Sequence, residues 1–450
     1  MRTDGARILL LSALAADGSN LEEGNLGNYA IIEPLFRHLR ERFPDSDIRT
    51  TLQLTDRFCT THKLIRLQDR RFFTFGRATC RETIKDLLRL GIWKLTHRWM
   101  PRTAVKILQR SALLGELVLA DLVVDWSGDV YGDNAAWPRF LEHSARLFMA
   151  IQLDKPVAVI AVSPGPFRQA WRRATARWLF DRVDLIANRE PESTALVTRM
   201  GVKNLCNRTT GCPAFLFPAC STDRVTQILR TEDIAGRSER REPLIGLVIS
   251  GWNLKGAKFN RVPREPWELE PFVQLVGCLV DQIGADVVVM SHQSGKRVDG
   301  ALVPGTDHSI VEQLLELVRA RYPNASVKTL AGVYQASDMK GLLGQFDLVL
   351  SGRIHGAIGA VSQCVPTVFL EYENGPVAHK VRGFARLVGL EDYVSRASDI
   401  RATTDVVTRC WQHRRELVAH LQQRIPEVQN ATMENFSLLE DILSCRKTCR

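Results

Sequence analysis

The sequence predicts an α/β protein with two doubly wound parallel sheets. Short β-branched runs alternate with longer helical patterns, which is typical of parallel sheets covered by helices. This alternation occurs twice, in two series separated by a polar stretch at 218–243. At 450 residues and 45% hydrophobic content, the chain is long enough and apolar enough to bury a large core.

The first series predicts an N-terminal domain over 1–217. Its predicted strands are 6–13, 118–124, 156–162 and 183–187, and its predicted helices are 28–42, 137–152, 168–181 and 191–200. Residues 218–243 are charged and lack an apolar period, so they are predicted to be an interdomain linker.

The second series predicts a C-terminal domain over 244–402, followed by a C-terminal helix and a basic tail over 403–450. Its predicted strands are 244–250, 285–290, 326–330, 346–350 and 366–371, and its predicted helices are 268–282, 309–320, 354–363 and 378–388. Two similar α/β halves are expected to enclose a cleft.

The segment 80–117 fits the alternation worst, because it combines Trp93 and Trp99 with many Lys and Arg residues. The favoured interpretation is a solvated helical insertion whose tryptophans pack inward; an interfacial helix at an anionic membrane is the alternative. For 168–182 the same reasoning favours a tryptophan stripe in the core and a solvated face that carries Arg172, Arg173 and Arg177.

A net charge of +10 favours acidic partners such as phosphorylated substrates or anionic lipid surfaces. Nucleic acid is disfavoured, because the basic residues match no reader motif. Ten scattered cysteines without a CxxC pair indicate reduced thiols and no zinc site. No apolar run reaches 18 residues, so we expect a cytoplasmic protein, with a peripheral position at the inner membrane face as the alternative.

The stretch 346–357 is the most informative part of the chain. It predicts a buried strand that ends at Gly352 and exposes Arg353 and His355 where a helix begins, with Gly356 following. Ligands of α/β sheets bind beyond the carboxyl ends of strands, and helix amino termini favour anions. His355 could therefore be a general acid or base in an anion site, or a structural core histidine.

Other loops that follow predicted strands supply further candidates. Gly24, Asn25, Gly27 and Asn28 precede a helix and could cradle a phosphate or a sugar hydroxyl. The loop that carries Ser127 and Gly128 is rich in aspartate but lacks calcium-loop spacing, so it predicts a substrate-orienting loop without metal. A further loop of this kind contains Gly165.

Two cations also follow predicted strands. Arg189 comes directly after strand 183–187, so it could grip a carboxylate or phosphate, or form a salt bridge with Glu190 or Glu192. Tyr372 and Lys380 follow strand 366–371 and could reach the same edge, although lysines in such places are usually on the surface.

The order of these motifs along the chain resembles that of the polysaccharide pyruvyl transferase family, over about residues 20 to 390. The motifs lie at 24–28, 163–167, 189–193, 347–356 and 365–380. The resemblance implies two Rossmann-like halves arranged as in GT-B glycosyltransferases. It implies transfer of a pyruvyl group from phosphoenolpyruvate to a sugar, with no metal or redox cofactor. The acceptor would be a sugar or a nucleotide-linked or lipid-linked saccharide.

The family pattern also implies roles for individual residues. His355 would donate or relay a proton, Arg189 and Lys380 would hold the acidic groups of the donor, and Arg353 would bind substrate. Asn28 and the loop after Trp126 depart from the family pattern. Two alternatives therefore stay open: a GT-B glycosyltransferase that uses a nucleotide sugar, and a non-catalytic relative that binds a glycan or an anion.

Overall fold

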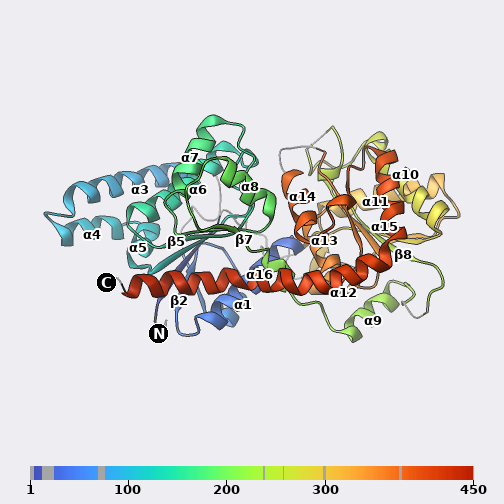
Figure 1. The fold of residues 1–450 in the computed structure, drawn as a ribbon, viewed down its shortest axis with the longest axis horizontal. Coiled ribbons are helices and arrows are strands. Elements are labelled where there is room, and N and C mark those ends of the chain that lie inside the picture. Colours follow the sequence, from blue (N-terminus) through green and yellow to red (C-terminus); the bar gives the residue numbers. More distant parts are fainter. Residues whose placement is uncertain are drawn as a thin grey trace. The chain divides into compact units, whose positions relative to one another are not determined.

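The computed structural model describes residues 5–12, 25–68, 77–236, 239–256, 258–296, 301–373 and 378–448 (Figure 1). The chain divides into two compact units. Unit 1 comprises Met1–Ser19, Leu35–Gly211 and Ala431–Arg450, and unit 2 comprises Asn20–Pro34 and Cys212–Asn430. The division passes through two helices, α1 (Leu26–Arg42) and α16 (Arg414–Thr448).

Unit 1 is built on a seven-stranded parallel sheet in the order β3-β2-β1-β4-β5-β6-β7. The strands are β1 (Arg7–Ser12), β2 (Asp47–Thr50), β3 (Leu64–Arg66), β4 (Leu122–Trp126), β5 (Val157–Val162), β6 (Leu185–Asn188) and β7 (Asn207–Thr209). Every residue of β5 is buried, as expected for a parallel strand with helices on both faces. The strand order is that of a doubly wound sheet, which reverses direction between β1 and β4.

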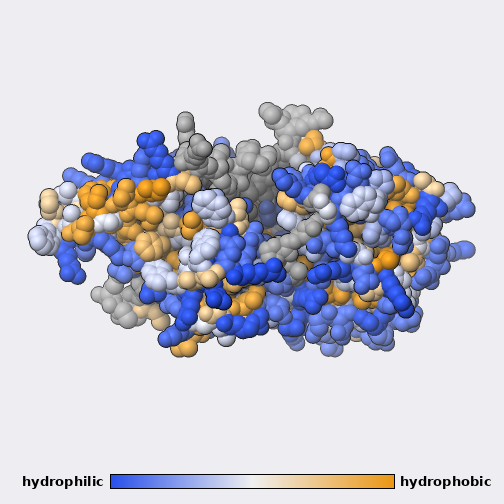
Figure 2. Space-filling model, turned by 90° about the horizontal axis from the view of Figure 1, so that it is seen from above, coloured by the Kyte–Doolittle hydropathy of each residue, from blue (hydrophilic) through white to orange (hydrophobic). Residues whose placement is uncertain are grey.

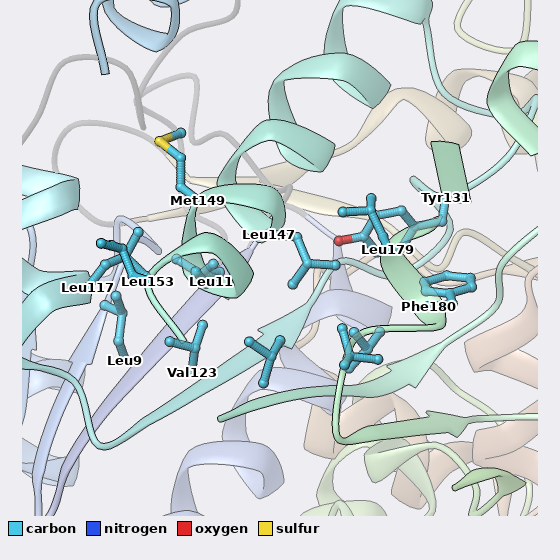
Figure 3. Close-up of a cluster of buried hydrophobic side chains, with 14 of the residues drawn as sticks. Leu9, Leu11, Leu117, Val123, Tyr131, Leu147, Met149, Leu153, Leu179 and Phe180 are labelled. Carbon is cyan, nitrogen blue, oxygen red and sulfur yellow. The ribbon is translucent and has the colours of Figure 1, made fainter. Parts of the chain in front are cut away.

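The remaining helices of unit 1 are α2 (Asp56–His62), α3 (Arg77–Thr96), α4 (Pro101–Gln109), α5 (Ala112–Leu119), α6 (Trp137–Gln152), α7 (Ala170–Phe180) and α8 (Pro191–Arg199). Figure 3 shows the core of this unit, where Leu9, Leu11 and Val123 from the sheet pack with Leu147 from α6. This apolar layer fixes α6 on the sheet, and thereby sets the position of the polar residues that α6 also carries.

Unit 2 is built on a six-stranded parallel sheet in the order β12-β9-β8-β13-β14-β15. The strands are β8 (Leu244–Val248), β9 (Asp286–Met290), β12 (Val327–Thr329), β13 (Leu348–Ser351), β14 (Thr367–Leu370) and β15 (Val394–Ser395), and a separate antiparallel pair consists of β10 (Ser294–Lys296) and β11 (Leu302–Pro304). This order is again doubly wound, with the reversal between β8 and β13.

The helices of unit 2 are α9 (Thr222–Thr231), α10 (Pro266–Ile283), α11 (Thr306–Arg321), α12 (Ala336–Leu343), α13 (Ile354–Val361), α14 (Ala378–Leu387) and α15 (Ile400–Gln412), with short 3-10 turns at Pro213–Leu216, Gly251–Asn253 and Glu391–Tyr393. Helix α10 begins at a capping box formed by Glu265 and Glu268, and it ends at Gly284 in the left-handed conformation.

The two parallel sheets confirm the predicted α/β class, but several details differ from the prediction. The predicted linker 218–243 contains α9, in which Val225, Ile228 and Leu229 are buried in the core of unit 2. The unit boundary falls after Gly211 rather than at 217, because the following residues pack in unit 2. The predicted strand 118–124 begins only at Leu122, since α5 continues to Leu119.

The basic insertion is helical, but its tryptophans do not all pack inward. Trp93 is partly buried against the core of unit 1, whereas Trp99 is 86% exposed. In α7, Arg172 is buried rather than solvated, because its guanidinium donates hydrogen bonds to the carbonyls of Gly132 and Ala135. Within the described ranges, no helix combines the length and hydropathy that a membrane span requires.

Candidate functional site

The polar residues of unit 2 gather where its sheet reverses direction. Strands β8 and β13 are neighbours, and the chain leaves them toward opposite faces of the sheet, which creates the ligand crevice of doubly wound folds. Three loops follow carboxyl ends at this edge: 249–253 after β8, 291–293 after β9 and 352–355 after β13. The candidate site of unit 2 is built from these loops and from the first turn of α1.

His355 lies against the first turn of α1. A Cβ atom on Gly27 would lie 2.7 Å from His355 Cγ, and closer still to Nδ1, so only glycine allows this approach. His355 itself belongs to the first turn of α13. The amino ends of two helices therefore meet at this imidazole, and each contributes a positive dipole end, which favours an anion.

The first turn of α1 is fixed to unit 2 on both sides of Gly27. Asn25 forms an isolated antiparallel bridge with Gln293, and its side-chain oxygen accepts a hydrogen bond from the Gly27 N–H at 3.1 Å. Leu26 is buried in the core of unit 2. Tyr29 contacts Phe217 edge to face, with ring centroids 5.7 Å apart. Apolar burial and a polar bridge thus hold Gly27 beneath His355.

Arg353 forms an ion pair with buried Asp307 in the first turn of α11. The distances are 2.8 Å from Nε to Oδ2 and 2.6 Å from Nη2 to the same oxygen. This pair ties the start of α13, the helix that carries His355, to α11.

A second histidine, His292, lies beside this loop and was missed in the sequence analysis. A Cβ on Gly356 would lie 3.5 Å from His292 Cδ2 and 2.8 Å from Ser351 Oγ. Burial, together with the nearby positive charge of Arg353, lowers the pKa of His292 to about 4. His292 is therefore a neutral hydrogen-bonding group at neutral pH.

Tyr372 and Lys380 come together at the same edge, as the sequence suggests. Lys380 Nζ lies 5.6 Å from the centroid of the Tyr372 ring, and the ring centroids of Trp252 and Tyr372 are 5.8 Å apart. The Asn253 side chain donates to the carbonyls that end β14, at 3.3 Å for Leu370 and 3.1 Å for Glu371.

Asn253 also connects these residues to the loop of His355. A Cβ on Gly352 would lie 2.8 Å from Asn253 Nδ2, so the close approach requires glycine at 352. Ser250 Oγ lies 3.4 Å from the Gly352 carbonyl oxygen and 3.1 Å from Asn253 Oδ1. The loops after β8, β13 and β14 are therefore one hydrogen-bonded assembly.

Unit 1 has its own polar cluster, at the end of β4. Ser127 Oγ hydrogen-bonds both Asp125 and His143 Nε2, and Nε2 also lies 2.7 Å from Asp125 Oδ1. The Tyr131 hydroxyl donates to Asp125 Oδ2 at 2.7 Å. All four side chains are buried, and burial beside Asp125 raises the pKa of Tyr131.

Serine and aspartate share one nitrogen of His143 in this cluster, whereas a nucleophilic triad uses both ring nitrogens. The arrangement is therefore suited to holding in place the loop that carries Ser127 and Gly128, whose substrate-orienting role stays a prediction. Gly128 has a positive φ of 62°, and its carbonyl accepts from the Ser163 N–H at 2.8 Å.

The loops after β5 and β6 are joined through Arg189. Its Nε donates to Ser163 Oγ at 2.7 Å, and the side chain is buried. Glu190 accepts from the Ser193 N–H at 2.9 Å as the N-cap of α8, and burial raises the pKa of Glu190. Glu190 is thus committed to the helix cap. Gly165 has a φ of 105°, and its carbonyl accepts from the Asn134 amide at 2.9 Å.

The predicted site residues fall into two groups. Unit 2 contains Asn25, Gly27, Asn28, Gly352, Arg353, His355, Gly356, Tyr372 and Lys380, and unit 1 contains Ser127, Gly128, Gly165 and Arg189. Gly24 lies outside the described residues. Among the residues described, no group of three or more His, Cys, Asp or Glu side chains is placed to hold a metal ion.

His292, Asp307 and His143 were not predicted from the sequence. His292 follows the carboxyl end of β9 within two residues. His355 was predicted because it follows the end of a strand, so the same reasoning could have identified His292. Asp307 lies 46 positions from Arg353 and His143 lies 16 positions from Ser127, each within a helix, and no local pattern indicates them.

Solved structures of low sequence identity share this two-unit α/β architecture. A glycosyltransferase from Rickettsia africae has a TM-score of 0.56 at 7% identity, covering 98% of this chain and 99% of its own. Anabaena Alr3699/HepE in complex with UDP has a TM-score of 0.55 at 12% identity, covering 97% and 100%. A putative UDP-N-acetylglucosamine 2-epimerase from Listeria monocytogenes has a TM-score of 0.54 at 12% identity, covering 99% and 96%.

These similarities define the fold as GT-B-like, built from two Rossmann-like units, as the sequence predicts. The model of the polysaccharide pyruvyl transferase family matches residues 25–374. The chain therefore belongs to this family, and is a transferase of polysaccharide biosynthesis. No curated protein matches the sequence significantly.

Proposed function

We propose that this protein transfers a pyruvyl group from phosphoenolpyruvate to a sugar, where it forms a cyclic ketal with two hydroxyls. The observation that carries the proposal is the meeting of two helix amino ends at His355, over Gly27. This arrangement supplies a titratable group within a field that favours a small, doubly acidic donor.

The chemistry requires one proton on carbon and the loss of phosphate. The methylene of phosphoenolpyruvate gains a proton, the first sugar hydroxyl adds to the central carbon, and the C–O bond to phosphate breaks. The second hydroxyl then closes the ketal, and the protons of both hydroxyls are released or passed on. His355 would be the proton donor or relay, acting as a general acid.

Fixed charges would stabilise the donor and its developing transition state. Lys380, next to Tyr372, and Arg189, next to Ser163, are proposed to hold carboxylate and phosphate oxygens. Arg353 is paired with Asp307, so we assign it to positioning His355 and shaping the local charge. The acceptor is proposed to be a nucleotide-linked or lipid-linked saccharide, and Ser127 and Gly128 are proposed to orient it.

A nucleotide-sugar glycosyltransferase is the second candidate. It is favoured by the stacked pair Trp252 and Phe259, whose rings are 4.2 Å apart and 8° from parallel, because such a platform could hold a base or a sugar. A non-catalytic relative that binds the same ligands is the third.

Ligand-induced thermal stabilisation separates the first two candidates. Phosphoenolpyruvate should raise the melting temperature in a concentration-dependent way, since a ligand that binds only the native state stabilises it. Stabilisation by nucleotide sugars alone would favour the glycosyltransferase. Stabilisation by phosphoenolpyruvate without phosphate release in the presence of acceptors would identify a non-catalytic relative.

A further inference from the structure

Helices α3, α6 and α7 of unit 1 surround an apolar pocket of about 820 Å³. Its lining includes Ile84 and Leu87 from α3, Leu141 and Phe148 from α6, and Trp178 from α7. Cavities of this size and lining accept hydrocarbon rather than polar ligands.

The apolar surface continues from this pocket along α3. Ile84, Leu88 and Leu95 are 57%, 63% and 81% exposed, and they recur at helical spacing on one stripe that ends near the exposed Trp99. Figure 2 shows hydrophobic residues gathered at the left end of the view, where α3 and α4 lie in Figure 1. Exposed side chains of this size in a row mark an interaction surface.

Positive charge accompanies this stripe. The segment 77–109 contains eight Lys and Arg residues and two acidic residues. Those two acids pair with neighbours on α3, Glu82 with Lys85 and Asp86 with Arg89. Arg98 in the turn between α3 and α4 is exposed, as are Arg102 and Lys106 on α4. The surface of an anionic lipid bilayer is complementary to this stripe, because the acyl chains contact the apolar side chains and the headgroup phosphates bind the cations.

We propose that the docking face, formed by α3, α4 and the apolar pocket between α3, α6 and α7, binds the surface of an anionic lipid bilayer. The exposed apolar side chains enter the headgroup region, and the cations contact lipid phosphates. Helix α6 also carries His143, whose cluster holds the loop of Ser127, so the docking face is part of the same unit as that loop. This inference does not depend on the identity of the reaction.

Vesicle flotation tests the proposal, with phosphatidylglycerol–phosphatidylcholine vesicles compared with pure phosphatidylcholine vesicles. The wild-type protein should float with the anionic vesicles and bind neutral ones at least about tenfold more weakly, and added salt should weaken the anionic binding. The double variant Leu88→Ser/Leu95→Ser should lose at least about tenfold in vesicle affinity. Leu205→Ser, at a residue 96% exposed elsewhere in unit 1, is the matched control and should bind as the wild type does.

Arg98→Glu/Arg102→Glu should lose binding to anionic vesicles only. None of these variants should alter phosphate release from phosphoenolpyruvate with a soluble acceptor. A negative result in vesicle flotation can therefore be distinguished from a failure of the proposed reaction. Absence of flotation by the wild type would overturn the proposal. A second result would also overturn it. If sedimentation velocity shows that the wild type self-associates, and Leu88→Ser/Leu95→Ser abolishes this self-association but leaves vesicle binding unchanged, the docking face is an interface between two copies of the chain.

Discussion

At the scale of the residue, the site of unit 2 depends on one close approach. Gly27 and His355 are more than 300 positions apart in the sequence, yet no side chain fits between them. Both residues were predicted from the sequence, because each lies near a predicted strand-to-helix junction. Their contact was not predictable, since it arises from the packing of the first turn of α1 within unit 2.

The Gly27→Ala variant tests this contact. The new methyl group would overlap the imidazole, so His355 must move, and we expect a loss of activity close to that of His355→Ala with little loss of secondary structure. Gly91→Ala is the matched control, because a Cβ there meets nothing within 4 Å. It should keep full activity and gain about 0.5–1 kcal/mol in unfolding free energy, which is typical of replacing a helical glycine. Normal activity of Gly27→Ala would contradict the placement of His355.

Arg189→Ala tests the proposed donor contact in unit 1. Loss of a charge-assisted hydrogen bond worth about 1.5–3 kcal/mol should weaken phosphoenolpyruvate binding by roughly ten- to a hundredfold. Isothermal calorimetry measures this directly, with exposed Arg208→Ala as the control in the same unit. Because Arg189 is buried, the more conservative variant Arg189→Lys should be measured as well, after its folding has been checked. Wild-type affinity in both Arg189 variants would remove this residue from donor binding.

At the scale of the element, α11 and α13 are linked through the ion pair between Asp307 and Arg353. The sequence indicated a helix in each place, but not the link, because ion pairs between separate helices leave no local pattern. The same limit explains α9 in the predicted linker: its apolar residues Val225, Ile228 and Leu229 are interspersed with charged residues, and the neighbouring charged stretch concealed their period.

Removing Asp307, the buried member of this pair, leaves the charge of the largely buried Arg353 uncompensated. We therefore expect Asp307→Ala to lower the unfolding free energy by about 3–5 kcal/mol, measured by urea denaturation. The double variant Asp307→Leu/Arg353→Met should recover most of that stability, because an apolar pair of similar volume replaces the charges. If the ion pair positions His355, the double variant should still have reduced activity. Full activity at full stability would show that the pair has only a structural role.

At the scale of the whole molecule, the two doubly wound parallel sheets follow from the sequence pattern, whereas the strand order within each sheet comes from the structure. The long alternating segments predicted the central strands and most helices. Short edge strands such as β3, β7 and β15, of two or three residues, were not predicted, because their runs are too brief to show a period. The boundary between the two units within α1 could not be predicted from the sequence either, because an uninterrupted helix carries no signal of the unit to which each turn belongs.

The buried His292 couples stability to pH. Its pKa falls from an unfolded value of 6.5 to about 4 in the folded protein, so below pH 6.5 the unfolded chain binds more protons than the folded one. Stability should therefore decrease as the pH falls from 6.5 to about 4, by up to about 3 kcal/mol from this group. In His292→Gln, urea denaturation at pH 7 and pH 5 should show a smaller difference than in the wild type. An equal difference would contradict the burial of a neutral His292.

The central claim is that His355 supports pyruvyl transfer from phosphoenolpyruvate. Phosphate release should be followed with a panel of saccharide acceptors while mass spectrometry detects the pyruvyl ketal, for the wild type, for His355→Ala and for His413→Ala, an exposed histidine of the same unit. We expect ketal formation by the wild type and by His413→Ala, and turnover about 10²–10⁴ lower in a folded His355→Ala. Ketal formation by His355→Ala at the wild-type rate would contradict it.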